Sequence, residues 1–346
     1  MFLIGSDFHP SWQQVSWLNR ESGETGDEKL VHEAGAAEKF YRRFPAGTRI
    51  AIEATGNCQW FLELMSGLGH EVLVGDAAKI CASDVRQQKH DKRDARLLLQ
   101  LLAEDRFPRI WTPSREEKYL RQLLIHRYKL VRIRVQVKNG LQHLAMNQGV
   151  LRKNRLWSKT GQQALRALPL ASWASRRRAD LLQMMSELDG KIDLLDQAVV
   201  EVAEKNEKAR LLMTQPGVGP ITALAFVLTL GDVSRFPRGK QVASYLGLIP
   251  REYSSGGKQR LGSISKQGNS FLRMLLVEAA QNAVRCDAEF RKEYLHRCHT
   301  KAKGVAKVAA ARKLAVRLYW MLRTMTRYPE IVRIESSSRV PLVSAS

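Results

Sequence analysis

The sequence has few cysteines. There are four, Cys58, Cys81, Cys286 and Cys298, and no two of them form a C-x-x-C pair. Neither a zinc ribbon nor a disulfide framework is therefore indicated, and we expect reduced, structural thiols. The sequence also lacks an apolar run of 18 residues and shows no signal-peptide pattern at Met1. These absences predict a cytoplasmic protein, associated with the nucleoid if its partner is DNA.

Acidic residues are scarce relative to basic ones. The 346 residues include 56 Lys and Arg against 34 Asp and Glu, which gives a formal charge of +22 and a pI near 10.1. Such a balance predicts a polyanionic partner, and nucleic acid is the natural one in the cytoplasm. The length is sufficient for two or three domains with proper cores.

Four acids in the first hundred residues stand out in this basic chain. Asp7 ends the apolar run 2–7 and Glu53 ends the run 49–53, so both are expected at one rim of a sheet. Asp91 can begin a helix, and Asp94 lies one turn further on the same face. Four carboxylates in this order can hold hard cations such as Mg²⁺ or Mn²⁺. Taken singly, each acid could equally be a helix cap or an ordinary strand-end residue.

Short apolar runs (2–8, 49–55, 71–75) alternate with helical stretches (29–43, 58–69, 91–106) in the first 112 residues. This alternation predicts an α/β layer fold. The segment 110–114 breaks the pattern, and Thr112 or Ser114 can cap the helix that follows. We therefore expect a domain boundary near residue 112.

Two long helices are predicted next. The first spans about 116–147, and residues 116–160 carry eleven Lys and Arg against two acids, with Arg121, Arg132 and Lys138 as candidate contacts to nucleic acid. The second spans roughly 178–213. Its apolar residues form an a/d seam, namely Leu181, Met185, Leu188, Ile192, Leu195, Val199 and Val202. The seam fits an antiparallel hairpin within one chain or an intermolecular coiled coil.

The segment Pro216-Gly-Val-Gly219 follows, just before a helix that begins near Pro220. It resembles the turn of a helix-hairpin-helix, in which Gly217 and Gly219 would let backbone amides approach a phosphate. A tight turn between two helices without a ligand is the alternative.

A hydroxyl among cations marks the segment 244–269. Ser255 is followed by two glycines, and Lys258, Arg260 and Lys266 lie nearby in the sequence. Such a hydroxyl can donate a hydrogen bond to a phosphate or attack a phosphodiester. No base lies close in the sequence, so an activating group would have to come from elsewhere in the fold.

The motifs taken in order resemble a known family. They are Gly5-Ser-Asp7, Ile52-Glu-Ala-Thr-Gly56, Asp91-Lys-Arg-Asp-Ala95, Pro216-Gly-Val-Gly219, Leu246-Gly-Leu-Ile-Pro250, Ser254-Ser-Gly256 and Ile264-Ser-Lys-Gln-Gly268. Together they look like the DEDD-type insertion-sequence transposases, the insertion-sequence family one-hundred-and-ten. These are relatives of the Piv DNA invertase and are also called bridge-RNA-guided recombinases. The resemblance covers about residues 1–325. One departure is Ser6, where a common version has an apolar residue; it should be tolerated because it points away from the rim.

The resemblance implies a RuvC-like, RNase H fold for the first domain, with Asp7, Glu53, Asp91 and Asp94 as ligands of Mg²⁺ or Mn²⁺. It implies that the serine before the glycine, here Ser255, is the nucleophile that becomes joined to DNA, although Ser254 leaves the register open by one residue. It also implies a coiled coil, dimers that pair into a tetramer, active sites shared between protomers, and a noncoding bridge RNA that pairs with target and donor DNA.

The expected organisation is a RuvC-like DEDD domain (1–112), a basic helical coiled-coil region (113–210), a mostly helical transposase domain with the serine loop (211–327) and a tail (328–346). The expected function is that of a transposase that cuts and rejoins DNA by metal-assisted serine attack, guided by RNA. Two rivals stay open: a metal-dependent junction nuclease that uses water, and a non-catalytic nucleic-acid-binding protein.

Overall fold

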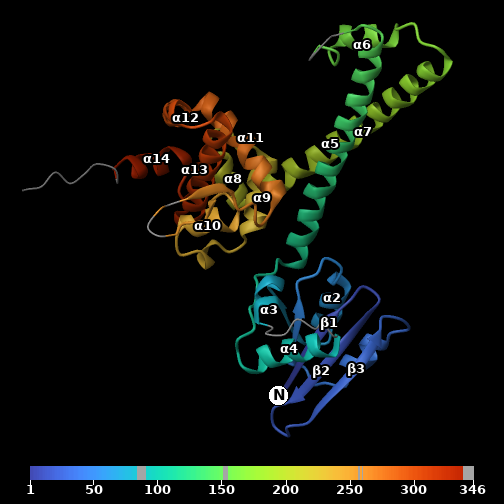
Figure 1. Ribbon diagram of the computed structural model, residues 1–346, viewed down its shortest axis with the longest axis vertical. Coiled ribbons are helices and arrows are strands. Elements are labelled where there is room, and N and C mark those ends of the chain that lie inside the picture. Colours follow the sequence, from blue (N-terminus) through green and yellow to red (C-terminus); the bar gives the residue numbers. More distant parts are fainter. Residues whose placement is uncertain (84–90, 151–154, 256–257, 259, 338–346) are drawn as a thin grey trace, which may run out of the picture. The chain divides into compact units, whose positions relative to one another are not determined.

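A computed structural model gives the structure of residues 1–83, 91–150, 155–255, 258 and 260–337 (Figure 1). The chain divides into two compact units, Met1–Thr112 and Pro113–Ser346. The first unit is a mixed α/β layer and the second is mostly helical, as the sequence predicts for the two parts of the chain. No helix within the described ranges is long and apolar enough to cross a membrane.

The first unit is built on a five-stranded sheet. Its strands are β1 (Phe2–Phe8), β2 (Trp12–Asn19), β3 (Thr25–Val31), β4 (Arg49–Glu53) and β5 (Glu71–Gly75). The order across the sheet is β3-β2-β1-β4-β5. The first three strands pair antiparallel, whereas β4 pairs parallel with both β1 and β5.

Helices cover both faces of this sheet. On one face, α1 (Ala36–Tyr41) and α2 (Gln59–Gly67) contribute Phe40, Tyr41, Phe61 and Met65 to a core around Ile4. On the other face lie α3 (Ala77–Ser83) and α4 (Asp91–Ala103). Their apolar side chains form a second core with strand residues, namely Leu3, Ala51, Leu73, Ile80, Leu98, Leu101 and Leu102. Because strand side chains alternate between faces, Asp7 and Glu53 fall on the face of α4.

The prediction of a helix over 29–43 is wrong at its start. Residues 25–31 form the edge strand β3, and the helix α1 covers only Ala36–Tyr41. The preceding strand β2 was not predicted at all. Most residues of β3 are exposed and its centre is the charged run Asp27-Glu-Lys29, so its sequence has no apolar alternation, and its strand conformation depends on pairing with β2.

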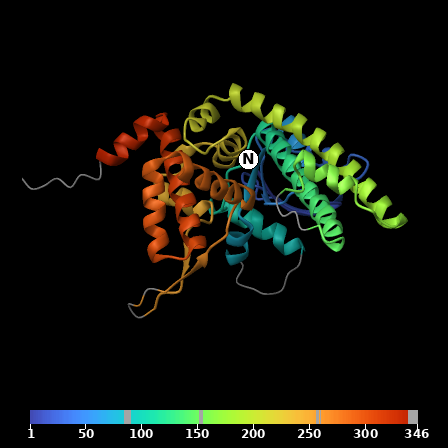
Figure 2. The ribbon, with the colours of Figure 1, turned by 90° about the horizontal axis from the view of Figure 1, so that it is seen from above.

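A helical hairpin opens the second unit. It consists of α5 (Arg115–Asn147), the short α6 (Lys159–Arg166) and α7 (Ser172–Lys205), and Figure 2 shows α5 and α7 side by side. The Ser114 side chain caps α5 in a reciprocal capping box with Glu117. The seam residues Met185, Leu188 and Ile192 pack within this chain, in one core with Val137 and Leu141 of α5. Of the two arrangements that the seam allowed, the antiparallel hairpin within one chain is present.

The second predicted helix, 178–213, is in fact two helices. It begins earlier, at Ser172, and is interrupted at Asn206 before α8 (Glu207–Met213). The Asn206 side chain accepts a hydrogen bond from the Ala209 amide (2.9 Å) and so caps the second piece. The break was hidden because the spacing of the seam continues past Asn206 to Ala209 and Met213.

The remaining elements form one helical core around the almost wholly buried α9. They are α9 (Pro220–Leu230), a 3-10 turn (Val233–Arg235), α10 (Gly239–Tyr245), the hairpin β6 (Pro250–Glu252) and β7 (Leu261–Ile264), α11 (Ser270–Cys286), α12 (Ala288–Thr300), α13 (Lys303–Thr324) and α14 (Tyr328–Ser337). The only strands described in this unit are β6 and β7. Their hairpin extends from the helical core and holds the loop that contains Ser255.

Candidate active site

The parallel pairing of β1 with β4 brings two acids to one rim. Gly5 lies opposite Ala51 and Ser6 opposite Ile52, so Asp7 and Glu53 are the next residues of the two strands. Ser6 points to the other face, where its hydroxyl donates to Oε1 of the buried Gln13 (2.7 Å). The polar residue at position 6 is therefore satisfied away from the rim, as predicted.

The helix α4 brings the other two acids to the same rim. Asp91 is its first residue, and Asp94 lies one turn before Leu98 on the stripe that packs against the sheet. The close approach depends on Gly5, where a Cβ atom would lie 2.2 Å from the carbonyl oxygen of Ala95. The helix backbone thus rests directly on β1.

The other three acids lie around Asp7 in two overlapping groups. Asp7, Glu53 and Asp94 line one pocket of about 100 Å³, together with the exposed Cys81 of α3. Ligand atoms of Asp7, His9 and Asp91 lie within 4.8 Å of one another. Pocket and cluster share only Asp7. Glu53 and Asp94 line the pocket with it and Asp91 lies beside it in the cluster, but in the described part of the chain no set of ligand atoms within 4.8 Å of one another joins all four acids.

His9 belongs to this site and was missed in the sequence. Its Nε2 lies 3.1 Å from Oδ2 of Asp7, and its ring stacks on Trp12 with the centroids 4.1 Å apart. The ring of Trp12 in turn has Lys29 Nζ 4.1 Å from its centroid. The signal that could have found His9 is its position two residues after Asp7, which places both side chains on one side of an extended chain.

A charge pair fixes α4 beside the site. Arg96 of α4 donates through Nε to Asp27 of β3 (3.2 Å), and Asp27 also accepts from the Ser16 hydroxyl (2.6 Å). The hydrogen bond from Arg96, against the opposing effect of burial, lowers the pKa of Asp27 below its ordinary value. Asp27 is therefore engaged in holding the helix and is not part of the pocket.

The two serines of the β6–β7 hairpin differ in their surroundings. The Ser254 hydroxyl donates to Oε1 of Glu252 (2.6 Å) and accepts from the Arg260 amide (3.2 Å). Ser255 is exposed at the tip, where its backbone bridges that of Lys258. Among the described residues no hydrogen bond of the Ser255 hydroxyl is found. The first serine is thus tied into the hairpin, and the second presents its hydroxyl outward.

The cations predicted to bind nucleic acid fall into two groups. Lys258, Arg260, Lys266 and Arg132 are exposed. Lys138 is half-buried, and its Nζ lies 5.2 Å from the ring centroid of Trp157. Arg121 donates through Nε to the carbonyl oxygen of Leu228 (3.0 Å), and burial lowers its pKa. Arg121 is thus engaged in joining α5 to α9.

The two glycines predicted to bind phosphate, Gly217 and Gly219, differ in how closely other atoms surround them. Gly217 has a φ of +87°, and a Cβ atom there would lie 2.4 Å from the amide nitrogen of Ala283. The positive φ and the close packing of this backbone on α11 explain why a glycine is needed at position 217. Gly219 is the N-cap of α9, and a Cβ atom there would meet nothing within 4 Å.

Comparison with known proteins places these features in a family. A model described as the transposase IS116/IS110/IS902 family matches residues 209–295, and a DEDD transposase model of the IS110 type matches residues 4–147. The chain is 30% identical over 308 residues to a protein of Sinorhizobium fredii named as a transposase, with 76% of each chain covered.

Two further relatives agree. A probable family 20 transposase of Pseudomonas aeruginosa is 29% identical over 330 residues, which is 92% of this chain and 96% of that protein. The pilin gene-inverting protein of Moraxella bovis is 26% identical over 281 residues, 79% of this chain and 76% of its own. The chain belongs to the IS116/IS110/IS902 family of insertion-sequence transposases, which are enzymes of DNA recombination.

Proposed function

We propose that this transposase cuts and rejoins DNA strands with two sets of residues, the acid pocket of the first unit and Ser255 of the second. The observation that carries the proposal is the convergence of Asp7, Glu53 and Asp94 on one pocket, inside the segment that matches the DEDD model. The first unit is, in this proposal, the RuvC-like domain, and its strand order β3-β2-β1-β4-β5 supports that assignment.

The donor set of the pocket suits a divalent cation. Carboxylate oxygens are the ligands that Mg²⁺ and Mn²⁺ prefer, and a pocket of about 100 Å³ leaves room for some of their water ligands. Asp7, Glu53, Asp91 and Asp94 would hold the ion, with the His9 imidazole as a further donor. A bound Mg²⁺ would supply charge neutralisation for the phosphodiester. The acids themselves fix its place, since each is anchored on a strand or on α4.

Ser255 supplies the nucleophile in this proposal. Its Oγ forms a bond to the phosphorus while the bond from phosphorus to the leaving strand's oxygen breaks. The hydroxyl proton ends on that leaving oxygen, so the strand departs as a free hydroxyl. The reverse attack by a hydroxyl end then releases the serine and rejoins the DNA. Both serines are exposed, and what supports Ser255 over Ser254 is that the Ser254 hydroxyl is hydrogen-bonded to Glu252 and to the Arg260 amide within the hairpin.

The finer features of the family are part of the same proposal. A bound noncoding RNA would choose the target and donor DNA, and protomers would pair first as dimers and then as a tetramer. The basic surfaces at 116–160 and 285–327 support binding of a polyanion, because the second of these carries twelve Lys and Arg against three acids. The turn between α8 and α9 would serve as the helix-hairpin-helix-like element.

A recombination assay with matched variants tests the role of the pocket. Asp94→Asn keeps the shape of the side chain but removes its charge, so we expect strand cutting to fall by a factor of about 10² or more. Asp105→Asn is the control, because Asp105 is exposed outside the pocket and its φ of +52° suits asparagine. Both variants should fold and bind DNA as the unaltered chain does. Full activity of Asp94→Asn would overturn the metal-assisted mechanism.

A further inference from the structure

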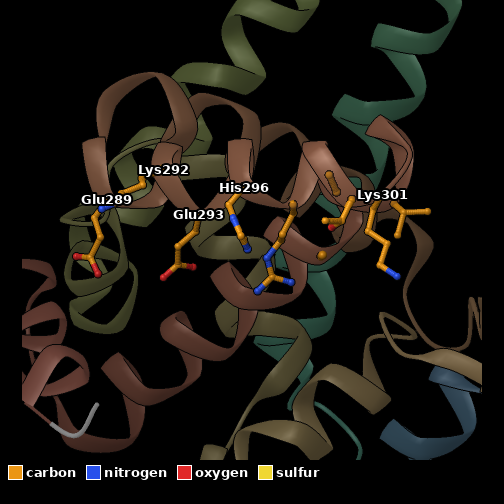
Figure 3. A pocket seen from close by; sticks show the side chains of 10 residues that line it. Glu289, Lys292, Glu293, His296 and Lys301 are labelled. Atoms are coloured by element: carbon orange, nitrogen blue, oxygen red, sulfur yellow. The ribbon is translucent and has the colours of Figure 1, made fainter. Parts of the chain in front are cut away.

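A second pocket, much larger than the acid pocket, lies in the second unit. It has a volume of about 760 Å³ and is formed by one face of α12, the first turns of α13 and the residues that join them. Figure 3 shows Glu289, Glu293 and His296 on one side of α12, with Lys301 at the end of the row. The volume lies in the range of pockets that hold small ligands.

The walls of this pocket differ from a simple basic patch. Lys292, Arg297 and Lys301 bring three cations, whereas Glu289 and Glu293 bring two carboxylates. Glu293 is paired with Lys313, whose Nζ lies 2.6 Å from Oε2. A surface that only followed a phosphate backbone would gain nothing from carboxylates, since they repel phosphates. The mixed lining indicates a ligand with both an anionic part and hydrogen-bond donors.

Flat and apolar groups complete the lining. Val305, Ala306 and Ala309 of α13 form an apolar wall, and Val305 is more than half exposed. The imidazole of His296 and the guanidinium of Arg297 are planar groups on the opposite helix. Unstacked bases pack on groups of this kind, and carboxylates accept hydrogen bonds from exocyclic amino groups of bases.

We propose that the pocket between α12 and α13 holds one unpaired nucleotide of a bound nucleic acid and prefers a base with an exocyclic amino group. The base lies between the apolar wall and the planar groups of His296 and Arg297. Lys292 and Lys301 contact the flanking phosphates, and Glu289 accepts from the amino group. The inference goes beyond the acid pocket and Ser255, and rests on the proposed function only in that the chain binds nucleic acid.

Short single-stranded oligonucleotides provide the test. Anisotropy of fluorescent oligomers of cytidine and uridine, each as RNA and as DNA, gives affinity, base preference and sugar preference in one series. We expect cytidine oligomers to bind more tightly than uridine or thymidine oligomers. Arg297→Ala combined with Lys301→Ala should weaken every oligomer by about tenfold. His296→Ala should weaken binding, and His296→Phe should restore it because a ring is again available for stacking.

The carboxylate has its own variant. Glu289→Gln keeps the size of the side chain but adds donors, so it should reduce the ratio of cytidine to uridine affinity without lowering the uridine affinity. Lys240→Ala is the charge control, because Lys240 is an exposed cation of α10 that does not line the pocket. Comparison of the RNA and DNA series then identifies which nucleic acid supplies the nucleotide.

Three results would overturn the proposal. The first is that Lys240→Ala weakens oligomer binding as much as the double variant does. The second is that the unaltered chain binds cytidine and uridine oligomers equally well. The third is that Glu289→Gln does not change the base preference. Thermal unfolding of each variant separates loss of binding from loss of fold. The oligomer assay measures binding and not cutting, so a failure of the recombination mechanism would leave this test intact.

Discussion

The His9 imidazole places a nitrogen donor beside the carboxylate of Asp7. It lies 3.1 Å from Asp7 and is held from the other side by stacking on Trp12. Nitrogen donors favour later first-row metals such as Co²⁺, whereas carboxylates alone favour Mg²⁺. A nitrogen donor in an otherwise all-oxygen site should therefore broaden its choice of metal.

His9→Ala tests this role directly. We expect the affinity for Co²⁺ to fall by about tenfold or more and the affinity for Mg²⁺ to change far less. Calorimetric titration and the visible absorption of bound Co²⁺ report binding without any DNA reaction. His32→Ala serves as the control, because His32 is a histidine of the same unit outside the cluster. If His9→Ala lowered the affinities for Co²⁺ and Mg²⁺ by the same factor, the result would contradict a ligand role for His9.

At the scale of elements, the site depends on how closely α4 rests on the sheet. Gly5→Ala would place a methyl group about 2.2 Å from the Ala95 carbonyl, so the helix must move. We expect a loss of stability of about 1–3 kcal/mol, as for other overpacked cores, together with weaker metal binding. Denaturant unfolding and calorimetry measure the two effects.

A second glycine-to-alanine variant distinguishes the effect of a steric clash from the general effect of replacing glycine by alanine. Gly67 ends α2 and has open space around its Cβ position, so Gly67→Ala should leave stability unchanged or slightly higher. A Gly5→Ala protein as stable as Gly67→Ala, with unchanged metal binding, would show that α4 does not need this close contact.

The pair between Arg96 and Asp27 predicts a dependence on pH. Because the folded pKa of Asp27 is lowered from 3.8, its charged form stabilises the fold. That contribution is complete above the ordinary pKa and is lost as the pH falls through the folded value. The difference in melting temperature between the unaltered chain and Asp27→Asn should therefore be constant near neutral pH and shrink below about pH 4. A difference that does not shrink at all below pH 4 would contradict this origin.

Elements of the fold differ in how far the sequence determines them. Asp7 and Glu53 could be placed because buried strands have a plain apolar pattern that ends at an acid. The edge strand β3 could not, since its conformation depends on pairing with β2 and not on its own residues. The break at Asn206 was hidden for the opposite reason, because helical periodicity continues on both sides of it.

The sequence alone is also insufficient to predict the surroundings of single residues of the candidate site. Arg121 and Arg132 look alike in sequence, yet one is bonded to the carbonyl of Leu228 and the other is exposed. Ser254 and Ser255 are adjacent, and only the hairpin geometry shows that the first is tied to Glu252. A tertiary contact decided the first case and the geometry of the β6–β7 hairpin decided the second, and neither can be predicted from the local sequence pattern.

At the scale of the whole molecule, the chain combines an acidic site in its first unit with an otherwise basic composition. The formal charge of +22 supports tight, salt-sensitive binding of nucleic acid, whereas Asp7, Glu53 and Asp94 line one small pocket of the first unit. In the mechanism that we propose, basic surfaces bind the nucleic acid and the acid pocket contributes to the chemistry. We propose that this chemistry proceeds through a covalent bond between Ser255 and DNA.

Trapping of that bond is the most direct measurement. A DNA substrate nicked near the cleavage point, incubated with the protein and Mg²⁺, should accumulate a protein–DNA adduct that mass spectrometry maps to Ser255. Ser255→Ala should form none, and Ser254→Ala should still form it. Cutting by Ser255→Ala at the rate of the unaltered chain, with no adduct in either, would contradict the account and favour attack by water.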